Sequence, residues 1–266
     1  MKKILSVLTA FTVLITVSCS TVPLTGRKQL SLVDDSQINQ SAAQSYSQLL
    51  SDPKTVVINN TTDAQRVKRV GSQLAAAIEG YLKTNGLADQ YNFKWEFNLI
   101  KSSEVNAWCM PGGKVAVYSG LMPLAKTDAE LATVMGHEIG HAIARHSAER
   151  VSQQMAVQGI GGAVGVASNT QSKATQTIIN QLYGVGGNLL LLKYSRNQES
   201  EADRLGLTFM ALAGYDPHAA LTFWQNMAAQ NKGGAPPELL STHPADATRI
   251  ADIQKRIPEA MNYYKH

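Results

Sequence analysis

Two histidines four residues apart, His137 and His141, enclose Glu138 in the middle of the chain and determine what the surrounding fold must provide. Apolar side chains around them recur at three- and four-residue spacing, which predicts a helix buried on one face. Residues four apart on a helix lie on the same side, so both imidazoles can bind a single Zn²⁺. Such a metal lowers the pKa of a bound water towards about 7, and Glu138 is placed to accept the proton.

The start of this helix is marked by Thr127 and Glu130, whose spacing lets each side chain cap a backbone donor of the other residue. The histidine motif alone can also arise by chance in a helix rich in His and Glu, where both histidines only pack or cap. A catalytic zinc needs a third protein ligand and an open fourth position. A later segment of the chain must therefore supply one more donor.

Residues 194–203 predict the beginning of a further helix that carries Glu199 and Asp203 on one face. Glu199 is the candidate third ligand. Asp203, one turn later, is placed to accept a hydrogen bond from the outer nitrogen of a ligand histidine. The two metal-bearing helices can approach closely because their facing sides carry small residues, namely Gly136, Gly140, Ala202 and Gly206.

Glu201 points away from that face of the predicted helix. We interpret it as a solvated carboxylate that pairs with Arg204 or Lys193. The spacing alone nevertheless leaves Glu201 as an alternative metal ligand.

The remaining pattern predicts two structural helices and three strands before the metal-binding helix. The helices are expected over residues 34–50 and 62–83, and the strands over 91–101, 105–110 and 114–118. In the first strand, aromatic and apolar residues alternate with polar ones, so Phe93, Trp95, Phe97 and Leu99 share one face. We expect an α+β fold: one zincin-like domain of the gluzincin kind, mostly helical, with a small sheet whose edge lies beside the metal helix.

Composition agrees with a single folded domain. The 266 residues are 44% hydrophobic and 17% charged, which excludes disordered and fibrous classes. The formal net charge of +4 is too small and too dispersed to indicate nucleic acid as a partner. The chain has two cysteines, Cys19 and Cys109. The N-terminal pattern described next predicts lipid on Cys19, which leaves Cys109 without a disulfide partner, so we interpret Cys109 as a small buried side chain.

The N-terminus predicts a secretory signal, because Lys2 and Lys3 precede an apolar run over residues 4–17. A membrane span is the alternative, but it needs about 20 apolar residues. Small Ser18 precedes Cys19 as at a bacterial lipoprotein cleavage site, so we expect lipidation at Cys19 rather than simple secretion. The expected parts are a signal peptide over 1–18, an anchor and lead segment over 19–33, and the zinc domain over 34–266.

Three motifs together resemble those of one family. They are His137-Glu138-x-x-His141, Tyr194-Ser195-Arg196-x-x-Glu199-x-x-Ala202-Asp203, and Thr242-His243-Pro244 with Arg249. In these residues the chain resembles metallopeptidase family forty-eight, which includes CAAX-prenyl endopeptidases, mitochondrial Oma-type peptidases and bacterial periplasmic lipoprotein peptidases. The resemblance extends from about Val22 to Ile257. The lead Val22-Pro23-Leu24-Thr25-Gly26-Arg27 resembles the bacterial lipoprotein branch.

The resemblance implies roles that the residues alone leave open. It favours Glu199 over Glu201 as the third zinc ligand. It implies that His243 either stabilises the reacting substrate or sits on the zinc as a gate, and that Arg249 anchors or helps it.

Two further segments lie near the predicted site. By resemblance, Asn106 and Ala107 at an edge strand bind an extended peptide as an additional strand, with ordinary sheet core as the alternative. Residues 153–188 are rich in Gly, Ala, Gln and Ser. They form either a mobile cover beside the site or a pair of close-packed helices.

Together these features imply a zinc-dependent endopeptidase with one Zn²⁺ per chain, Glu138 as general base, and exposed or misfolded polypeptides as substrates. We expect it in the periplasm, lipid-anchored to the outer membrane because Ser20 follows Cys19, with envelope assembly or chaperone proteins as partners. One alternative is a zinc-bound chaperone-like or assembly-factor lipoprotein whose active site is normally closed. A purely structural zinc site is disfavoured, because such sites usually have four protein ligands.

Overall fold

The computed structural model describes residues 19–157, 177, 194–230, 238–243 and 247–264. The expected signal peptide over 1–18 and most of the segment 153–188 lie outside these residues. In the described part the helices are α2 (Asp35–Ser51), α3 (Thr62–Thr84), α4 (Asp128–Ile143), α5 (His146–Val157), α8 (Arg196–Leu212), α9 (His218–Gln230), α10 (Glu238–Thr242) and α11 (Ala247–Met261). The strands are β1 (Cys19–Thr21), β2 (Lys28–Leu30), β3 (Val57–Ile58), β4 (Glu96–Ile100), β5 (Ala107–Met110) and β6 (Lys114–Tyr118).

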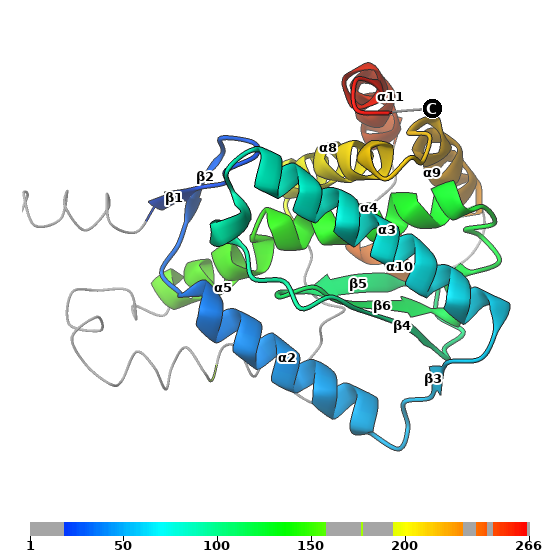
Figure 1. Cartoon of the computed structure of the whole chain (residues 1–266), viewed down its shortest axis with the longest axis horizontal. Coiled ribbons are helices and arrows are strands. Elements are labelled where there is room, and N and C mark those ends of the chain that lie inside the picture. The colour runs from blue at the N-terminus through cyan, green and yellow to red at the C-terminus, as the bar shows by residue number, and fades with distance from the viewer. Residues whose placement is uncertain (1–18, 158–176, 178–193, 231–237, 244–246, 265–266) are drawn as a thin grey trace, which may run out of the picture.

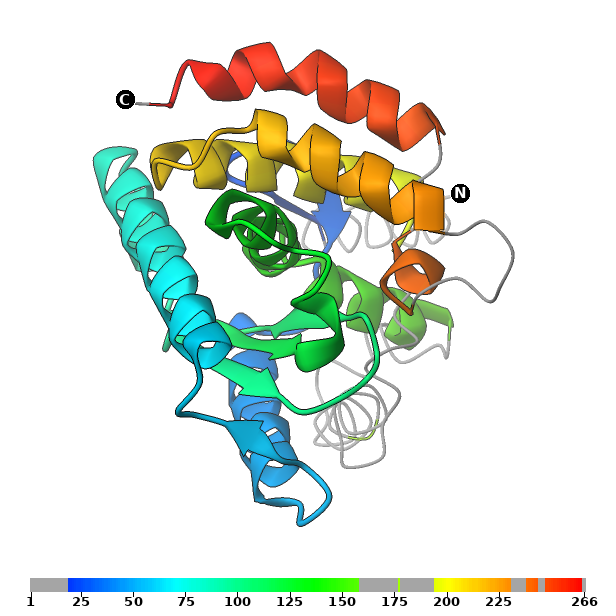
Figure 2. The same ribbon diagram turned by 90° about the vertical axis from the view of Figure 1, so that its right-hand side faces the viewer.

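These elements stack in layers around α4 (Figures 1 and 2). The main sheet lies between α2 on one face and α3 with α4 on the other. On the far side of α4 lie α8 and α9, and α11 covers these two helices. As a result, every residue of α4 from Glu130 to His141 is buried.

The main sheet has the strand order β3-β4-β6-β5. The pair β4–β6 is parallel, whereas β3–β4 and β5–β6 are antiparallel. Among the described strands β5 pairs only with β6, and it packs against α4. The expected sheet edge beside the metal helix is therefore confirmed, and with it the α+β, zincin-like fold.

Both faces of this sheet are buried, because α2 covers the face that α3 and α4 leave free. Val115 and Val117 belong to the large core around α4, and Ala116 between them belongs to a smaller core with α2. Asn98 also faces α2 and is 8% exposed. Its amide donates a hydrogen bond of 3.0 Å to the hydroxyl of Tyr46, so this polar side chain is shielded from solvent by α2.

The predicted and observed bounds of the elements differ most at the strand predicted over residues 91–101. The expected helices over 34–50 and 62–83 and the strand over 114–118 are confirmed within one residue at each end. The strand predicted over 91–101 instead begins at Glu96. The aromatic residues at alternate positions stack in a row that starts before β4. Their ring centroids are 4.4 Å apart for Phe93–Trp95 and 6.0 Å apart for Trp95–Phe97.

Glycines allow α4 and α8 to pack with their backbones in contact. A Cβ on Gly140 would lie 2.8 Å from the carbonyl oxygen of Ala202. A Cβ on Gly206 would lie 2.8 Å from the backbone nitrogen of His137. The predicted close approach of the two helices is confirmed, and it brings Glu199 within reach of the histidines on α4.

The lead segment forms a small hairpin in which β1 and β2 pair antiparallel. Its turn closes at Gly26, whose φ of 72° is readily adopted by glycine and whose N–H donates to the Val22 carbonyl at 2.8 Å. Val22 is fully buried, and β2 packs against α5. The lead is therefore packed against α5, the helix that directly follows α4 in the chain.

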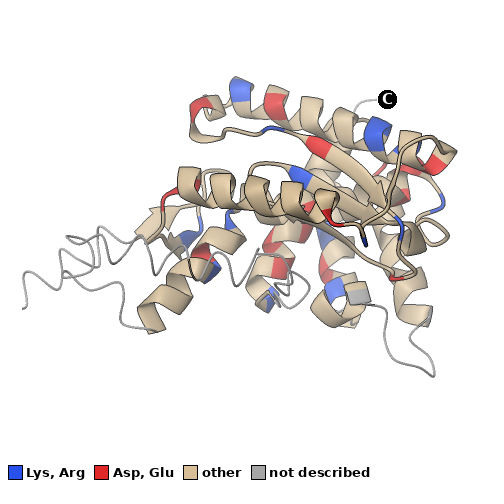
Figure 3. Ribbon diagram, turned by 90° about the horizontal axis from the view of Figure 1, so that it is seen from below, with Lys and Arg blue, Asp and Glu red and all other residues tan. Residues whose placement is uncertain are grey.

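Charged residues of both signs are interspersed along the helices seen from below (Figure 3). Several pair across elements, for example Arg204 with Glu259 at 2.6 Å and Arg69 with Asp128 at 2.8 Å. Within the described residues, none of the helices combines the length and apolar character that crossing a membrane requires.

Candidate metal centre

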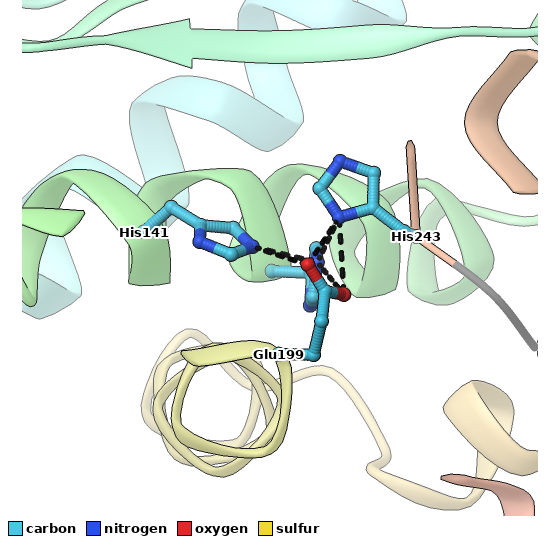
Figure 4. A group of neighbouring side chains, drawn as sticks. His141, Glu199 and His243 are labelled. Carbon is cyan, nitrogen blue, oxygen red and sulfur yellow. Dashed lines mark hydrogen bonds and ion pairs between the residues drawn. The ribbon is translucent and has the colours of Figure 1, made fainter. Parts of the chain in front are cut away.

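Four buried side chains converge where α4, α8 and the residue after α10 meet. His137 and His141 come from α4, Glu199 from the first turn of α8, and His243 directly follows α10. One ligand atom from each residue lies within 4.8 Å of the other three. Figure 4 shows that His141, Glu199 and His243 point towards one another.

The spacing of these atoms fits a zinc ion. Zinc binds imidazole nitrogen at about 2.0–2.1 Å in a tetrahedron, which separates neighbouring ligand atoms by about 3.3 Å. His137 Nε2 lies 3.1 Å from His141 Nε2 and 3.2 Å from His243 Nδ1. Oxygens of Glu199 lie 3.5 Å from each Nε2 of His137 and His141, and 2.9 Å from His243 Nδ1. Imidazole and carboxylate are donor types that zinc prefers, and three of them with an open fourth position would form a catalytic site.

Both helices begin at capping boxes that fix the rotation of their metal-facing sides. Glu130 N donates to the Thr127 hydroxyl at 3.1 Å, and Thr127 N donates to the Glu130 carboxylate at 2.8 Å, which confirms the predicted cap. Ser195 and Gln198 form a second capping box at the start of α8. The Ser195-x-x-Gln198 spacing carries the same signal in the sequence, and it places Glu199 in the first helical turn.

Glu138 lies beside the four converging side chains and is 3% exposed. Its Oε1 is 3.6 Å from His243 Nε2, and among the described residues this oxygen has no hydrogen-bond partner. Burial raises the pKa of the Glu138 carboxyl, and the neighbouring His243 and His137 offset only part of that rise. The free oxygen of a buried carboxylate is well suited to hold and move a proton at the site.

His137 is held from behind by a buried acid–base pair. Its Nδ1 lies 2.8 Å from Asp203 Oδ1, and Arg249 donates to both carboxylate oxygens of Asp203 at 2.8 Å. The guanidinium of Arg249 also lies 3.7 Å from the ring centroid of Trp224 and donates to the His243 carbonyl at 3.0 Å. Burial raises the pKa of Asp203, but Arg249 and His137 outweigh it and hold that pKa well below its usual range.

Our interpretation of Glu201 as a solvated carboxylate is wrong. Glu201 is 8% exposed and accepts hydrogen bonds from Thr25 and Arg27, while its Oε2 lies 2.9 Å from His146 Nε2. Arg204, one of its expected partners, pairs with Glu259 instead. The lead segment lies against α8 at this point, which a helix pattern read in isolation does not reveal.

Two side chains that contact His141 were not singled out for that role from the sequence. His146 Nδ1 lies 2.8 Å from His141 Nδ1, and the ring of Tyr194 stacks on His141 at a centroid separation of 3.9 Å. A histidine five residues after the motif is not on the same helical face, so periodicity gives no hint of this contact. It becomes possible because α4 ends at Ile143 and the chain turns before α5 begins.

The predicted peptide-binding residues lie at the start of β5. Asn106 is 2% exposed, and its side-chain oxygen accepts from the N–H of Ala107 at 2.9 Å. The carbonyl of Asn106 accepts from Tyr118 N at 3.0 Å, which joins this segment to β6. Cys109 further along β5 is partly buried, and burial raises the pKa of its thiol.

Comparison with known proteins agrees with this geometry. The chain is 35% identical over 189 residues to mitochondrial metalloendopeptidase OMA1 of Schizosaccharomyces pombe, covering 71% of this chain and 53% of that protein. It is 29% identical over 248 residues to the metalloendopeptidase OMA1 of Bos taurus, covering 90% and 46%. It is 30% identical over 175 residues to the beta-barrel assembly-enhancing protease of Escherichia coli K12, covering 64% and 36%.

The chain thus spans about half the length or less of these relatives. The model of peptidase family M48 matches residues 62–257, which include both metal-bearing helices and the segment with His243 and Arg249. The resemblance seen in the motifs is confirmed: this chain belongs to peptidase family M48.

Proposed function

We propose that this chain is a zinc-dependent endopeptidase that acts on exposed or misfolded proteins in the bacterial envelope. The observation that carries the proposal is a convergence of three imidazoles and one carboxylate beside Glu138, whose buried Oε1 has no hydrogen-bond partner among the described residues. Membership of a family of peptidases supports the same activity.

In this proposal His137, His141 and Glu199 hold the zinc. The ion supplies a Lewis acid that polarises the scissile carbonyl and acidifies water. Glu138 accepts a proton from the attacking water and delivers it to the leaving amine, a role that its position beside the ligand atoms allows. Asp203 accepts a hydrogen bond from Nδ1–H of His137 and so keeps Nε2 unprotonated and free to face the ion.

The substrate would lie along β5. Because β5 pairs only with β6 among the described strands, its other edge can accept an extended peptide as a further strand. Ala107 begins β5 and Asn106 directly precedes it, and β5 packs against the metal helix α4. Backbone pairing orients the scissile bond and tolerates many side chains, which suits an enzyme that cleaves unfolded segments.

The test is to replace Glu138 by Gln, which keeps the shape of the side chain and removes its basicity. We expect zinc content to stay at about one ion per chain and casein cleavage to fall by at least about 10²-fold. Glu259→Gln is the matched control, because Glu259 lies on the surface of α11 and pairs only with Arg204 in the described ion pairs. Equal cleavage by wild type and Glu138→Gln would eliminate Glu138 as the base.

A second candidate function follows from the position of His243. Its Nδ1 lies among the other ligand atoms and so can serve as a fourth zinc ligand that closes the site, as expected for a chaperone-like or assembly-factor lipoprotein. His243→Ala separates the two candidates. Higher cleavage by this variant identifies a gate, whereas lower cleavage identifies a stabiliser of the reacting substrate.

The location in the envelope is part of the same proposal. It is supported by the lipoprotein-like residues Ser18-Cys19-Ser20, by the exposure of Cys19 and by the beta-barrel assembly-enhancing protease of Escherichia coli among the relatives. In a bacterial host, we expect the wild-type chain to carry lipid at Cys19 and to sediment with outer membranes. Cys19→Ala should be recovered without lipid, and membrane recovery equal to that of wild type would contradict the anchor.

A further inference from the structure

The second nitrogen of His141 meets another imidazole rather than a carboxylate. His141 Nδ1 and His146 Nδ1 are 2.8 Å apart, and the two ring planes are inclined by 67°. His146 is fully buried. Its remaining nitrogen, Nε2, lies 2.9 Å from Glu201 Oε2. The three side chains form a continuous row that leads from the metal centre towards the lead segment.

The positions of the protons in this row follow from the metal site. His141 Nε2 faces the other ligand atoms and must be unprotonated to bind an ion, so its Nδ1 carries the proton. Nδ1 of His141 therefore donates to Nδ1 of His146. Nε2 of His146 then carries a proton and donates to the Glu201 carboxylate. In this arrangement, every ring nitrogen outside the metal position has a hydrogen-bond partner.

The carboxylate at the end of the row is held by the lead. Thr25 and Arg27 donate to the two oxygens of Glu201. Arg27 also donates to Glu149 at 3.0 Å, and Glu149 accepts from Gln198 at 2.8 Å. Arg27 therefore joins the lead to both α5 and α8, although its own side chain is 24% exposed.

The fold explains how residues so distant in sequence meet. After α4 ends, Arg145 adopts a left-handed conformation with φ of 57°, which turns the chain before α5 begins at His146. The side chain of His146 is thereby placed behind His141. On α8, Glu201 lies two residues after Glu199 and faces the lead instead of the metal centre.

We propose that His146 and Glu201 are positioning residues that hold His141 in the tautomer and orientation needed to bind zinc, and that Arg27 of the lead keeps Glu201 in place. The proposal rests on the zinc site proposed above. Zinc affinity then depends on the lead, which lies directly after the expected lipid-bearing Cys19. The negative charge of Glu201 also makes His141 a stronger ligand through the intervening imidazole.

The experiment measures the zinc dissociation constant of the full chain by competition with a coloured chelator, together with the visible spectrum of the cobalt-substituted protein. We expect Glu201→Gln and His146→Ala to weaken zinc binding by about 10- to 100-fold and to alter the cobalt bands. Arg27→Ala should weaken binding in the same direction, and Arg27→Lys should restore part of the loss. Excess zinc should recover most of the peptidase activity of Arg27→Ala, which a purely structural role would not predict.

The matched controls are Arg204→Ala and Glu259→Gln, which break an ion pair on exposed parts of α8 and α11. They should leave zinc affinity and the cobalt spectrum unchanged. Because His146 is fully buried, His146→Ala can fail to fold, and then Glu201→Gln and Arg27→Ala decide the question. Zinc affinity and cobalt spectra equal to wild type in these two folded variants would overturn the inference. A wild-type chain that binds no zinc would instead overturn the proposed function.

Discussion

The two histidines of α4 are supported in different ways. His137 meets a carboxylate directly, and Asp203, Arg249 and Trp224 behind it form a closed group within α8, α9 and α11. The acid and the base of this group are 4% and 8% exposed, and their charges cancel. This support belongs wholly to the core of the domain.

The support of His141 is longer and ends near the surface. A second imidazole, His146, separates His141 from its carboxylate, and the final cation, Arg27, is 24% exposed. Arg27 also lies before residue 62, where the match to the family model begins. The difference suggests a division of roles: the Asp203 side stabilises the domain, and the His146 side makes the metal site responsive to the lead.

The largest loss of stability is expected from a variant that removes the Asp203 support of His137. In Asp203→Asn, Arg249 loses the nearer of two buried counter-charges and keeps Glu199, whose Oε2 lies 3.5 Å away. An amide donor then faces either the guanidinium or the Nδ1 proton of His137. Removing one partner of a buried ion pair costs about 3–5 kcal/mol in the free energy of unfolding. Urea denaturation of the zinc-loaded protein measures this loss.

Asp252→Asn is the matched control for that variant. Asp252 pairs with Arg256 at 2.9 Å, but these side chains are 32% and 26% exposed, so the expected loss is about 0–1 kcal/mol. Similar losses in the free energy of unfolding for Asp203→Asn and Asp252→Asn would show that the buried ion pair stabilises the protein no more than the exposed one. Arg27→Ala is expected to change stability less than Asp203→Asn while still changing zinc affinity.

A change at the helix contact should affect both supports together. In Gly140→Ala the new methyl group would lie 2.8 Å from the Ala202 carbonyl oxygen, so α4 and α8 must separate. We expect a loss of about 1–3 kcal/mol in the free energy of unfolding and weaker zinc binding, because both histidines move relative to Glu199. Thermal or urea unfolding with a zinc titration measures both effects.

Gly80→Ala is the control, because there the same substitution is expected to raise the free energy of unfolding rather than lower it. Gly80 is inside α3, is exposed, and would place its methyl group in open space. There alanine should stabilise the helix by about 0.5–1 kcal/mol relative to glycine. Destabilisation by Gly80→Ala equal to that by Gly140→Ala would contradict an effect specific to the helix contact.

The parts of this site that could be predicted from the sequence are those encoded by local spacing. Thr127 and Glu130 mark the helix start, and the two histidines and Glu199 carry helical spacing or a matching motif. Small residues at Gly140 and Ala202 predict the close approach of the two helices. In each case the decisive residues are close in sequence or form a repeated pattern on one helix face.

The support of His141 could not be predicted in this way. Arg27 and Glu201 are far apart in sequence, and helical spacing favours Arg204 rather than Arg27 as the partner of Glu201. Glu201 on α8 occupies a helix position that the sequence pattern marks as solvated, but in the fold it is buried between the lead and His146 of α5. Asn98 shows the same effect, since α2 packs over a strand face that alternation alone marks as polar. Tertiary contacts decide burial in both cases.

The smallest expected effect concerns Arg145, the residue that turns the chain towards His146. Its φ of 57° costs a non-glycine residue about 1–2 kcal/mol, whereas glycine adopts it freely. The side chain offsets part of this cost through an ion pair with Asp35 at 2.9 Å and a hydrogen bond to the Gln90 carbonyl at 2.6 Å. Since an ion pair of this exposure contributes about 0–1 kcal/mol, we expect Arg145→Gly to change the free energy of unfolding by less than about 1 kcal/mol.

Comparison with Arg145→Ala isolates the backbone contribution, because both variants lose the same side-chain contacts. The alanine variant keeps the backbone strain and should therefore be less stable than the glycine variant by about 1 kcal/mol, as measured by urea unfolding. Equal stability would mean that the turn after α4 relaxes to another conformation when the Arg145 side chain is removed. In that case His146 would lose its fixed position behind His141, and zinc affinity should fall in both variants. If the ordering holds with zinc affinity preserved, the turn itself places His146, and the contacts of Arg145 are secondary.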